Sequence, residues 1–179
     1  MPATHTDPFG QPLRRVEDER LVTGQGRYVA DLPTRRPPLH LAVLRSPHPH
    51  AEIAALDTRR AAALPGVAAV LTATDLEGVG DLPCDWVVPK MTAVPRQPVL
   101  AQGRVRYVGQ PVAAVAAETP AIALDALELL DSAYAPLTAA TTVEAATSAA
   151  APNLHESVSG NRAFTFTRTG GGDFEQAAA

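Results

Sequence analysis

Short apolar runs, separated by proline- and glycine-rich stretches, make up most of the hydrophobic pattern of this chain. Leu39–Ser46, Val67–Thr72 and Val112–Ala117 are apolar and bounded by turn-forming residues, so each is predicted to be a buried strand. Ala51–Asp57 follows the first run across the sequence Pro-His-Pro-His, and we expect it to be the antiparallel neighbour of that strand. Ser132–Leu137 is predicted to be a closing strand.

Local signals predict two short helices. Residues 58–64 follow Asp57, a typical N-cap residue, and they end at Pro65-Gly66, a stop signal. The composition shifts to Ala, Thr and Ser over residues 138–159, where we expect a short helix near Val143–Ala146 and then a linker.

A longer helix is predicted after the strongest strand signal, Arg104–Thr119, which a Gly-Gln-Pro turn divides into two runs. Thr119 is a typical N-cap, and Pro120 suits the first helical position. Leu124 falls on the opposite side from the apolar face and is expected to project away from the core. That apolar face is formed by residues at helical spacing: Ile122, Ala126, Leu129 and Leu130. The order of strand, helix and strand fits a small α+β sandwich.

A long irregular excursion is predicted over residues 73–104, because prolines and glycines interrupt it throughout. Short strands are expected within it around Trp86–Val88 and Val99–Leu100. A connection of this length in a compact domain is usually functional or an interaction surface.

The last part of the chain carries an alternating pattern. Asn161–Arg168 places Phe164 and Phe166 on one face, which predicts a single strand that needs a sheet to join. Gly170–Gly172 and then Asp173, a typical N-cap, follow this segment and predict the start of a helix.

Composition and charge exclude several classes of function. Apolar residues make up 46% of the 179 residues, so wholesale disorder is not expected. The net charge of −4 leaves no basic surplus, so we expect no nucleic-acid partner. Cys84 is the single cysteine, which excludes an internal disulfide framework and a zinc knuckle. The polar N-terminal sequence predicts neither a secretory signal nor a membrane span, and hence a cytoplasmic protein without a membrane partner.

Few residues suggest a catalytic or metal site. His48 and His50 have the spacing that can place two imidazoles on one face of a strand, but apart from Glu52 no carboxylate or thiol lies nearby in sequence. A proline-rich turn with exposed histidines is therefore the favoured interpretation. His40 is expected to be a hydrogen-bonded core or interface residue. Cys84 lacks an activating pattern, so a packed or idle thiol is favoured over a nucleophile.

Three glycine-containing segments suggest phosphate or anion binding only superficially. Gly24–Val29 begins like a dinucleotide-binding sequence, but it lacks the third glycine and no strand precedes it. A flexible turn is the favoured interpretation of Gly170–Gly172, and a structural turn is favoured for Gly109–Pro111. The residues alone therefore assign no catalytic, cofactor-binding or metal-binding position.

The order and wording of five segments resemble a known family. They resemble the α/β hammerhead domain, the N-terminal part of the large, molybdenum-cofactor-binding subunit of the xanthine dehydrogenase, aldehyde oxidase and carbon monoxide dehydrogenase family. The resemblance covers about residues 15–179. The segments are RVEDERLVTGQGRYVADL (15–32), LHLAVLRSPHPHAEIAALDT (39–58), LPGVAAVLTATDL (64–76), VRYVGQPVAAVAAET (105–119) and DALELLDSAYAPL (125–137).

The resemblance implies an oxidoreductase lineage whose members hydroxylate a carbon with oxygen taken from water, or oxidise carbon monoxide. Electrons in such enzymes pass from molybdopterin-bound molybdenum to [2Fe-2S] clusters and usually FAD, often on separate subunits. The implied partners are the remaining molybdenum-binding part of the large subunit, the iron–sulfur subunit and the FAD subunit. The family's molybdenum site is built mostly downstream of the hammerhead domain, so we expect this chain alone to bind no cofactor and to catalyse no reaction.

The resemblance also divides the chain. We expect a flexible arm over residues 1–14, the hammerhead domain over 15–140, a linker over 141–160 and the truncated start of the molybdenum-binding domain over 161–179. The expected role is the N-terminal portion of a large subunit, which contributes to an oxidoreductase complex without holding its catalytic site. Two alternatives stay open: a free-standing assembly module that binds the iron–sulfur subunit, and a non-functional gene fragment.

Overall fold

The computed structural model describes residues 12, 14–83 and 93–167 of the chain, which divides into two compact units, 1–38 and 39–179. The first unit contains the short helix α1 (Asp18–Val22) and the 3-10 turn η1 (Val29–Asp31). Most of the expected arm over residues 1–14 lies outside the described residues.

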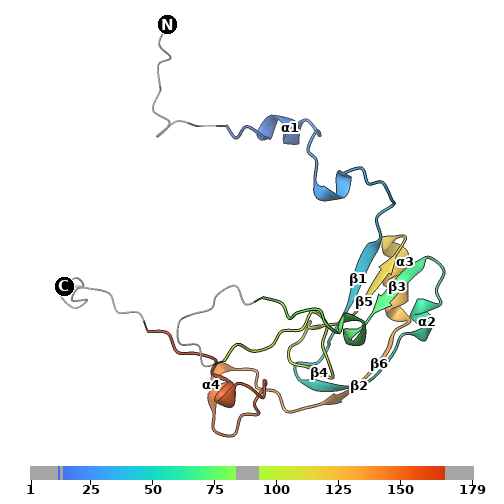
Figure 1. Cartoon of the computed structure of the whole chain (residues 1–179). Coiled ribbons are helices and arrows are strands. Elements are labelled where there is room, and N and C mark those ends of the chain that lie inside the picture. The colour runs from blue at the N-terminus through green and yellow to red at the C-terminus, as the bar shows by residue number, and fades with distance from the viewer. Residues whose placement is uncertain (1–11, 13, 84–92, 168–179) are drawn as a thin grey trace. The chain divides into compact units, whose positions relative to one another are not determined.

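The second unit contains two small antiparallel sheets, so the fold class is α+β (Figure 1). In the described residues, one sheet has the order β1-β5-β3 and the other the order β4-β2-β6. The strands of the first sheet are β1 (His40–Arg45), β5 (Pro111–Ala117) and β3 (Val67–Leu71); those of the second are β4 (Arg104–Val105), β2 (Ala51–Asp57) and β6 (Asp131–Pro136).

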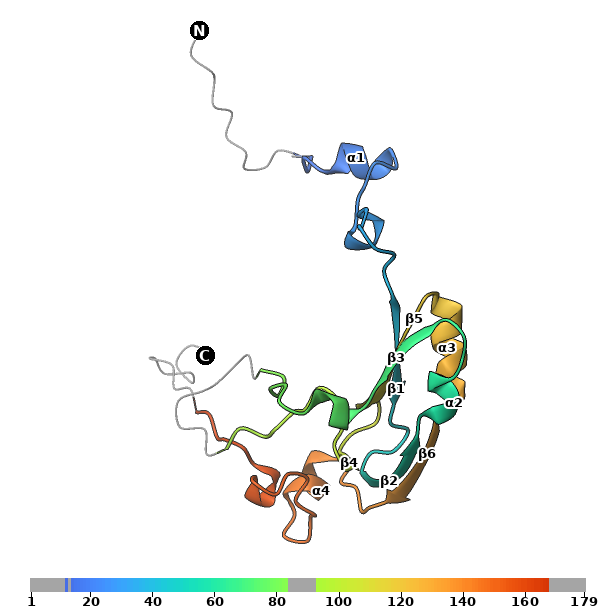
Figure 2. The same cartoon turned by 45° about the vertical axis from the view of Figure 1, so that its right-hand side comes forward.

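Two helices cover one face of the β1-β5-β3 sheet (Figures 1 and 2). These are α2 (Arg59–Ala62) and α3 (Pro120–Glu128), which contact each other as well as the strands. A further helix, α4 (Val143–Thr147), and the 3-10 turns η2 (Ala73–Leu76) and η3 (Ser159–Asn161) lie outside this layer.

The core joins the two sheets. Between β5 and the helices, Ala113 and Val115 are fully buried against Ala126 of α3. A second cluster at the other end of β5 gathers small residues of both sheets around Val105 and Val112. Leu44 and Leu56 pack against both clusters, so the two sheets share one continuous apolar interior.

The structure confirms the predictions for α3. Thr119 is the N-cap: its hydroxyl oxygen accepts a hydrogen bond from the backbone N–H of Ile122 at 3.2 Å. Ala126 is fully buried, as the predicted apolar face requires, whereas Leu124 is 60% exposed and projects away from the core. The strands predicted at 39–46, 51–57, 67–72, 112–117 and 132–137 and the helix near 143–146 are also present, with small shifts at their ends.

The expected pairing of β1 with β2 is wrong. β1 pairs with β5, aligning His40 with Ala117, whereas β2 pairs with β4 and β6 in the other sheet. The chain passes between the sheets at the Pro-His-Pro-His sequence, where two prolines remove the backbone donors that a hairpin ladder needs. Ser46 holds this crossing, because its backbone N–H donates to Gln110 and its carbonyl accepts from Gly109.

Two local predictions need correction. Thr58, not Asp57, is the N-cap residue of α2; Asp57 ends β2, and its Oδ1 accepts the backbone N–H of Arg59 at 3.0 Å. The segment Val99–Leu100 is a bend and not a strand, with Leu100 turned into the interior. The strand expected around Trp86–Val88 lies outside the described residues.

The alternating segment after residue 161 does not form the predicted strand in its described part. Residues 162–167 have no strand assignment, and neither described sheet includes them. The predicted turn at 170–172 and the helix start at Asp173 lie outside the described residues.

Candidate functional site

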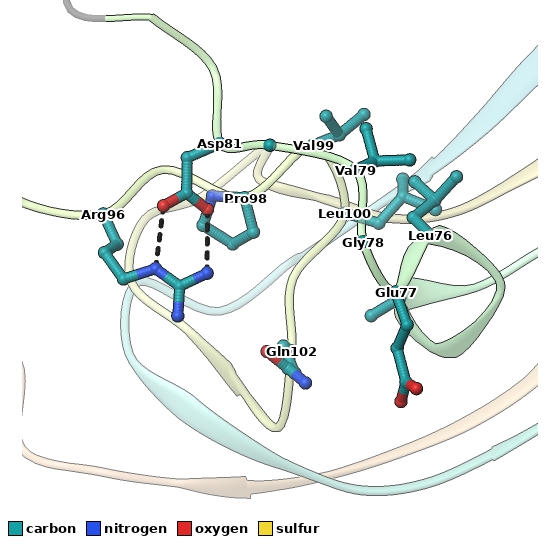
Figure 3. Close-up of a pocket in the computed structure, with 12 residues that line it drawn as sticks. Leu76, Glu77, Gly78, Val79, Asp81, Arg96, Pro98, Val99, Leu100 and Gln102 are labelled. Atoms are coloured by element: carbon teal, nitrogen blue, oxygen red, sulfur yellow. Dashed lines mark hydrogen bonds and ion pairs between the residues drawn. The ribbon is translucent and has the colours of Figure 1, made fainter.

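The 73–104 excursion forms a pocket of about 220 Å³ beside η2 (Figure 3). Its wall is formed by residues 76–81 on one arm and 98–100 on the other, together with Ala73, Arg96 and Gln102. Figure 3 shows Gln102 and Glu77 at its lower side, with the Glu77 carboxylate pointing away from the other polar side chains.

An ion pair holds the two arms of the excursion together. Arg96 donates from Nε to Asp81 at 2.7 Å and from Nη2 at 3.1 Å, and Leu82 donates its backbone N–H to the Gln97 carbonyl at 2.8 Å. The hydrogen bonds from Arg96 lower the pKa of the Asp81 carboxyl below its usual value of 3.8. Asp81 therefore stays ionised at neutral pH and is poorly suited to be a general acid or base.

A second cavity, of about 310 Å³, lies where the excursion returns toward the β4–β5 turn. Arg106 is half-buried in its wall and donates from Nε to the Leu154 carbonyl at 3.0 Å. Burial lowers the pKa of the Arg106 guanidinium and of the neighbouring His155 imidazole, and the charge of Arg106 lowers that of His155 further. This cavity therefore brings two nitrogen-rich side chains together that are distant in the sequence.

Asn161 positions the segment that carries Leu154 and His155. Its amide nitrogen donates to the carbonyls of Ala146 and Pro152, both at 2.9 Å, and its Oδ1 accepts from the backbone N–H of Leu154 at 2.8 Å. Asn161 has a φ of +56°, in the left-handed region that asparagine tolerates better than most residues. The segment predicted as a linker is therefore folded, and a single side chain supplies three of the hydrogen bonds that hold it.

Gln110 explains the Gly-Gln-Pro turn. Its side chain is 3% exposed, and its Oε1 accepts the backbone N–H of Arg106 at 2.6 Å. Its own backbone N–H donates to the Tyr107 carbonyl at 3.2 Å, which closes the turn between β4 and β5. The structural interpretation of Gly109–Pro111 is confirmed, and Gln110 also fixes the start of the Arg106 side chain.

The histidines lie in three different environments. His50 is 4% exposed, so the expectation of an exposed turn is wrong for it; its Nδ1 donates to the Thr138 carbonyl at 2.7 Å. His48 is half-buried and its ring lies 5.1 Å from that of Tyr134. His40 is exposed at the start of β1, not in the core. Cys84 lies outside the described residues, and no group of three His, Cys, Asp or Glu side chains within the described ranges is arranged to hold a metal ion.

Comparison with known proteins identifies the family. Residues 23–138 match the family described as aldehyde oxidase and xanthine dehydrogenase, a/b hammerhead domain. The chain belongs to this family. The resemblance of the five ordered segments is thereby confirmed, and both cavities described above involve residues of the hammerhead domain.

Two relatives show how the hammerhead domain occurs in longer proteins. The chain is 40% identical over 126 residues to the nicotine 6-hydroxylase large subunit of Paenarthrobacter nicotinovorans, covering 68% of this chain and 15% of the relative. It is 41% identical over 130 residues to the carbon monoxide dehydrogenase large chain of Afipia carboxidovorans, covering 72% of this chain and 15% of the relative. The chain therefore spans less than a fifth of the length of these relatives.

A solved structure supports the same assignment. The Cu,Mo-CO dehydrogenase in its carbon monoxide-reduced state matches with a TM-score of 0.69 at 39% identity, covering 80% of this chain and 17% of that one. Among the described residues, the polar side chains that line the two cavities are arginine, glutamine, histidine, tyrosine, one glutamate and an ion-paired aspartate, with no thiolate and no cluster of ligands, and they do not fit a molybdenum centre. Within the described ranges, no helix combines the length and apolarity that crossing a bilayer requires.

Proposed function

We propose that this chain is the hammerhead portion of the large subunit of a molybdenum hydroxylase. The observation that carries the proposal is the family match over residues 23–138, together with relatives named as the large chains of a nicotine hydroxylase and a carbon monoxide dehydrogenase. This portion contributes structure to the oxidoreductase complex. The groups that oxidise the substrate lie in the rest of the large subunit, which makes up more than four-fifths of the relatives.

The proposed partners follow from that role. The remaining molybdenum-binding part of the large subunit is the direct partner, and an iron–sulfur subunit and an FAD subunit complete the complex. Residues 15–140 act as the hammerhead domain, 141–160 connect it, and 161–179 belong to the start of the molybdenum-binding domain. The folded segment around Asn161 supports this division, because it packs α4 and η3 together and neither described sheet continues beyond β6.

Affinity purification from the native cells tests this function. The protein is tagged at its own locus, isolated at moderate salt and separated by size, and the molybdenum in each fraction is measured by mass spectrometry. We expect the hammerhead sequence to elute with a molybdenum-containing large subunit, in the same polypeptide or beside it. Elution with an iron–sulfur protein alone would favour an assembly module, and elution without any partner would favour a non-functional fragment; either result contradicts the proposal.

A further inference from the structure

Several of the residues that line the 310 Å³ cavity at the β4–β5 turn carry hydrogen-bond donors. None of the described residues that line it has a carboxylate side chain, and the same is true of a smaller adjoining cleft of about 90 Å³. The residues with polar side chains that line it are Arg96, Gln97, Arg106, Tyr107, Gln110 and His155. A cavity with this lining favours an acceptor-rich, negatively charged group.

Arg106 supplies a positive charge that the described residues do not neutralise. Its Nε–H is used by the Leu154 carbonyl, but its terminal Nη groups have no hydrogen bond or ion pair in the described part of the chain. The nearby carboxylates are engaged elsewhere: Asp81 pairs with Arg96, and Glu52 pairs with Arg104. Glu156 favours the charged form of Arg106 without forming an ion pair with it. A half-buried guanidinium in this state gains strongly from an opposite charge.

A buried amide adds a second donor. Gln110 is only 3% exposed, and its Oε1 already accepts a hydrogen bond from the backbone N–H of Arg106. Its Nε2 donates no hydrogen bond to any described residue, although it borders the cavity. This amide nitrogen is accessible rather than sealed in the interior, so it can donate to a group that enters the cavity. Both donors would be satisfied by the same ligand oxygen atoms.

We propose that this cavity is an oxyanion-binding site, in which Arg106, Gln110 and His155 hold a carboxylate, phosphate or similar group. Arg106 contributes the charge and a planar pair of Nη donors, Gln110 a neutral donor, and His155 an imidazole N–H. The cavity volume accommodates a single small anion or the end of one acidic side chain. The ligand is either a free anion or a carboxylate of the rest of the large subunit.

His155 reports occupancy of the site directly. Its pKa is lowered by burial and by the charge of Arg106, and Arg96 and Glu156 are the other charged groups near it. An anion bound between Arg106 and His155 offsets the charge of Arg106 and stabilises the protonated form of His155, so the pKa of His155 rises. Sulfate is the probe of choice because it does not titrate near neutral pH.

The test is a histidine titration of the full 179-residue chain by NMR. The spectra are recorded in sodium sulfate and in sodium chloride of equal ionic strength, and His155→Asn identifies the His155 signal. We expect sulfate to raise the pKa of His155, as a nearby opposite charge does, and to leave the ring signals of His48, which does not line the cavity, in place. An equal response of both histidines, or none, would overturn the proposal.

Variants separate the site from general salt effects. Arg106→Gln should abolish the response of His155 to sulfate, Arg106→Lys should weaken it, and Arg60→Gln, an exposed arginine of α2, should leave it intact. The Arg106 variants also lose or alter the hydrogen bond to the Leu154 carbonyl, which affects folding. Thermal denaturation of His155→Asn, which keeps that hydrogen bond, therefore gives a second measure of binding. Sulfate should stabilise this variant less than it stabilises Arg60→Gln. Equal stabilisation of the two variants would contradict the site.

The source of the anion is distinguished in the assembled complex. If a carboxylate of the large subunit fills the site, sulfate no longer shifts His155 in the complex, and Arg106→Gln weakens the association of the chain with its companion. If the ligand is a free anion, the sulfate response persists in the complex. Binding to the isolated chain does not depend on the proposed function, so the two proposals fail separately.

Discussion

Gly66 is the position where a single methyl group should be most informative about the packing of this domain. It lies between α2 and β3 with a φ of +87°, and its carbonyl accepts the backbone N–H of Glu118 at 2.9 Å. A Cβ at this position would lie 2.7 Å from Cδ1 of Ile122. Gly66→Ala should therefore cost about 1–2 kcal/mol for the left-handed conformation and at least about 1 kcal/mol for displacing Ile122.

A matched variant separates these two contributions. Gly109 has a φ of +89°, and a Cβ there would meet nothing within 4 Å. Gly109→Ala should lose only the contribution of the left-handed backbone conformation. Its free energy of unfolding, measured in urea by far-ultraviolet circular dichroism, should therefore be about 1 kcal/mol higher than that of Gly66→Ala. Both variants should be less stable than the wild type.

The Ile122 side chain provides the decisive comparison. Ile122→Val removes Cδ1, the atom closest to the added methyl group. In the Ile122→Val background, Gly66→Ala should reduce the free energy of unfolding no more than Gly109→Ala does. A double-mutant cycle of Gly66→Ala and Ile122→Val should therefore give a coupling energy of about 1 kcal/mol. Equal losses for Gly66→Ala and Gly109→Ala in the wild-type background, with no coupling to Ile122, would refute the packing of α3 on the α2–β3 turn.

Three further predictions address the caps, the helix faces and the response to acid. Thr119→Ala should cost about 1 kcal/mol in urea unfolding, because the Ile122 N–H loses its acceptor, and Thr119→Ser should restore most of it. Leu124→Glu should change stability by less than about 0.5 kcal/mol, whereas Ala126→Glu, at a fully buried position, should prevent cooperative unfolding; similar effects would refute the assigned helix face. Arg59 lowers the pKa of Asp57 from 3.8 to about 2, so the stabilisation by this carboxylate is present above 3.8 and is lost as the pH falls toward 2. The difference in melting temperature between wild type and Asp57→Asn should shrink across that range, and a constant difference would contradict the ion pair.

The local elements of the fold are predictable from sequence because their signals are local. The Thr119-Pro120 start, the exposed Leu124 and the apolar runs depend on neighbours a few residues away. The pairing of β1 is not of this kind: it joins strands about 70 residues apart, and the period-two pattern is the same for every possible partner. The prolines near His48 are a local signal against a hairpin, and they mark the passage between sheets.

The residues of the candidate site are less accessible to sequence analysis. Arg106 and His155 meet only because Asn161 folds the 146–161 segment against itself and the Arg106 side chain reaches Leu154. No periodicity or spacing encodes that contact. The Gly-Gln-Pro turn points to the right region, but as a turn; the donors of Gln110 become visible only when its burial is known. The family assignment, by contrast, is accessible from sequence, because it depends on the order of sequence motifs and requires no knowledge of contacts.

The central claim is that this chain belongs to a molybdenum hydroxylase large subunit without holding the metal itself. The most direct test is the molybdenum content of the isolated 179-residue chain, measured beside that of the complex purified through it. The account predicts stoichiometric molybdenum in the complex and none that survives desalting in the isolated chain. Stoichiometric molybdenum in the isolated chain would contradict it.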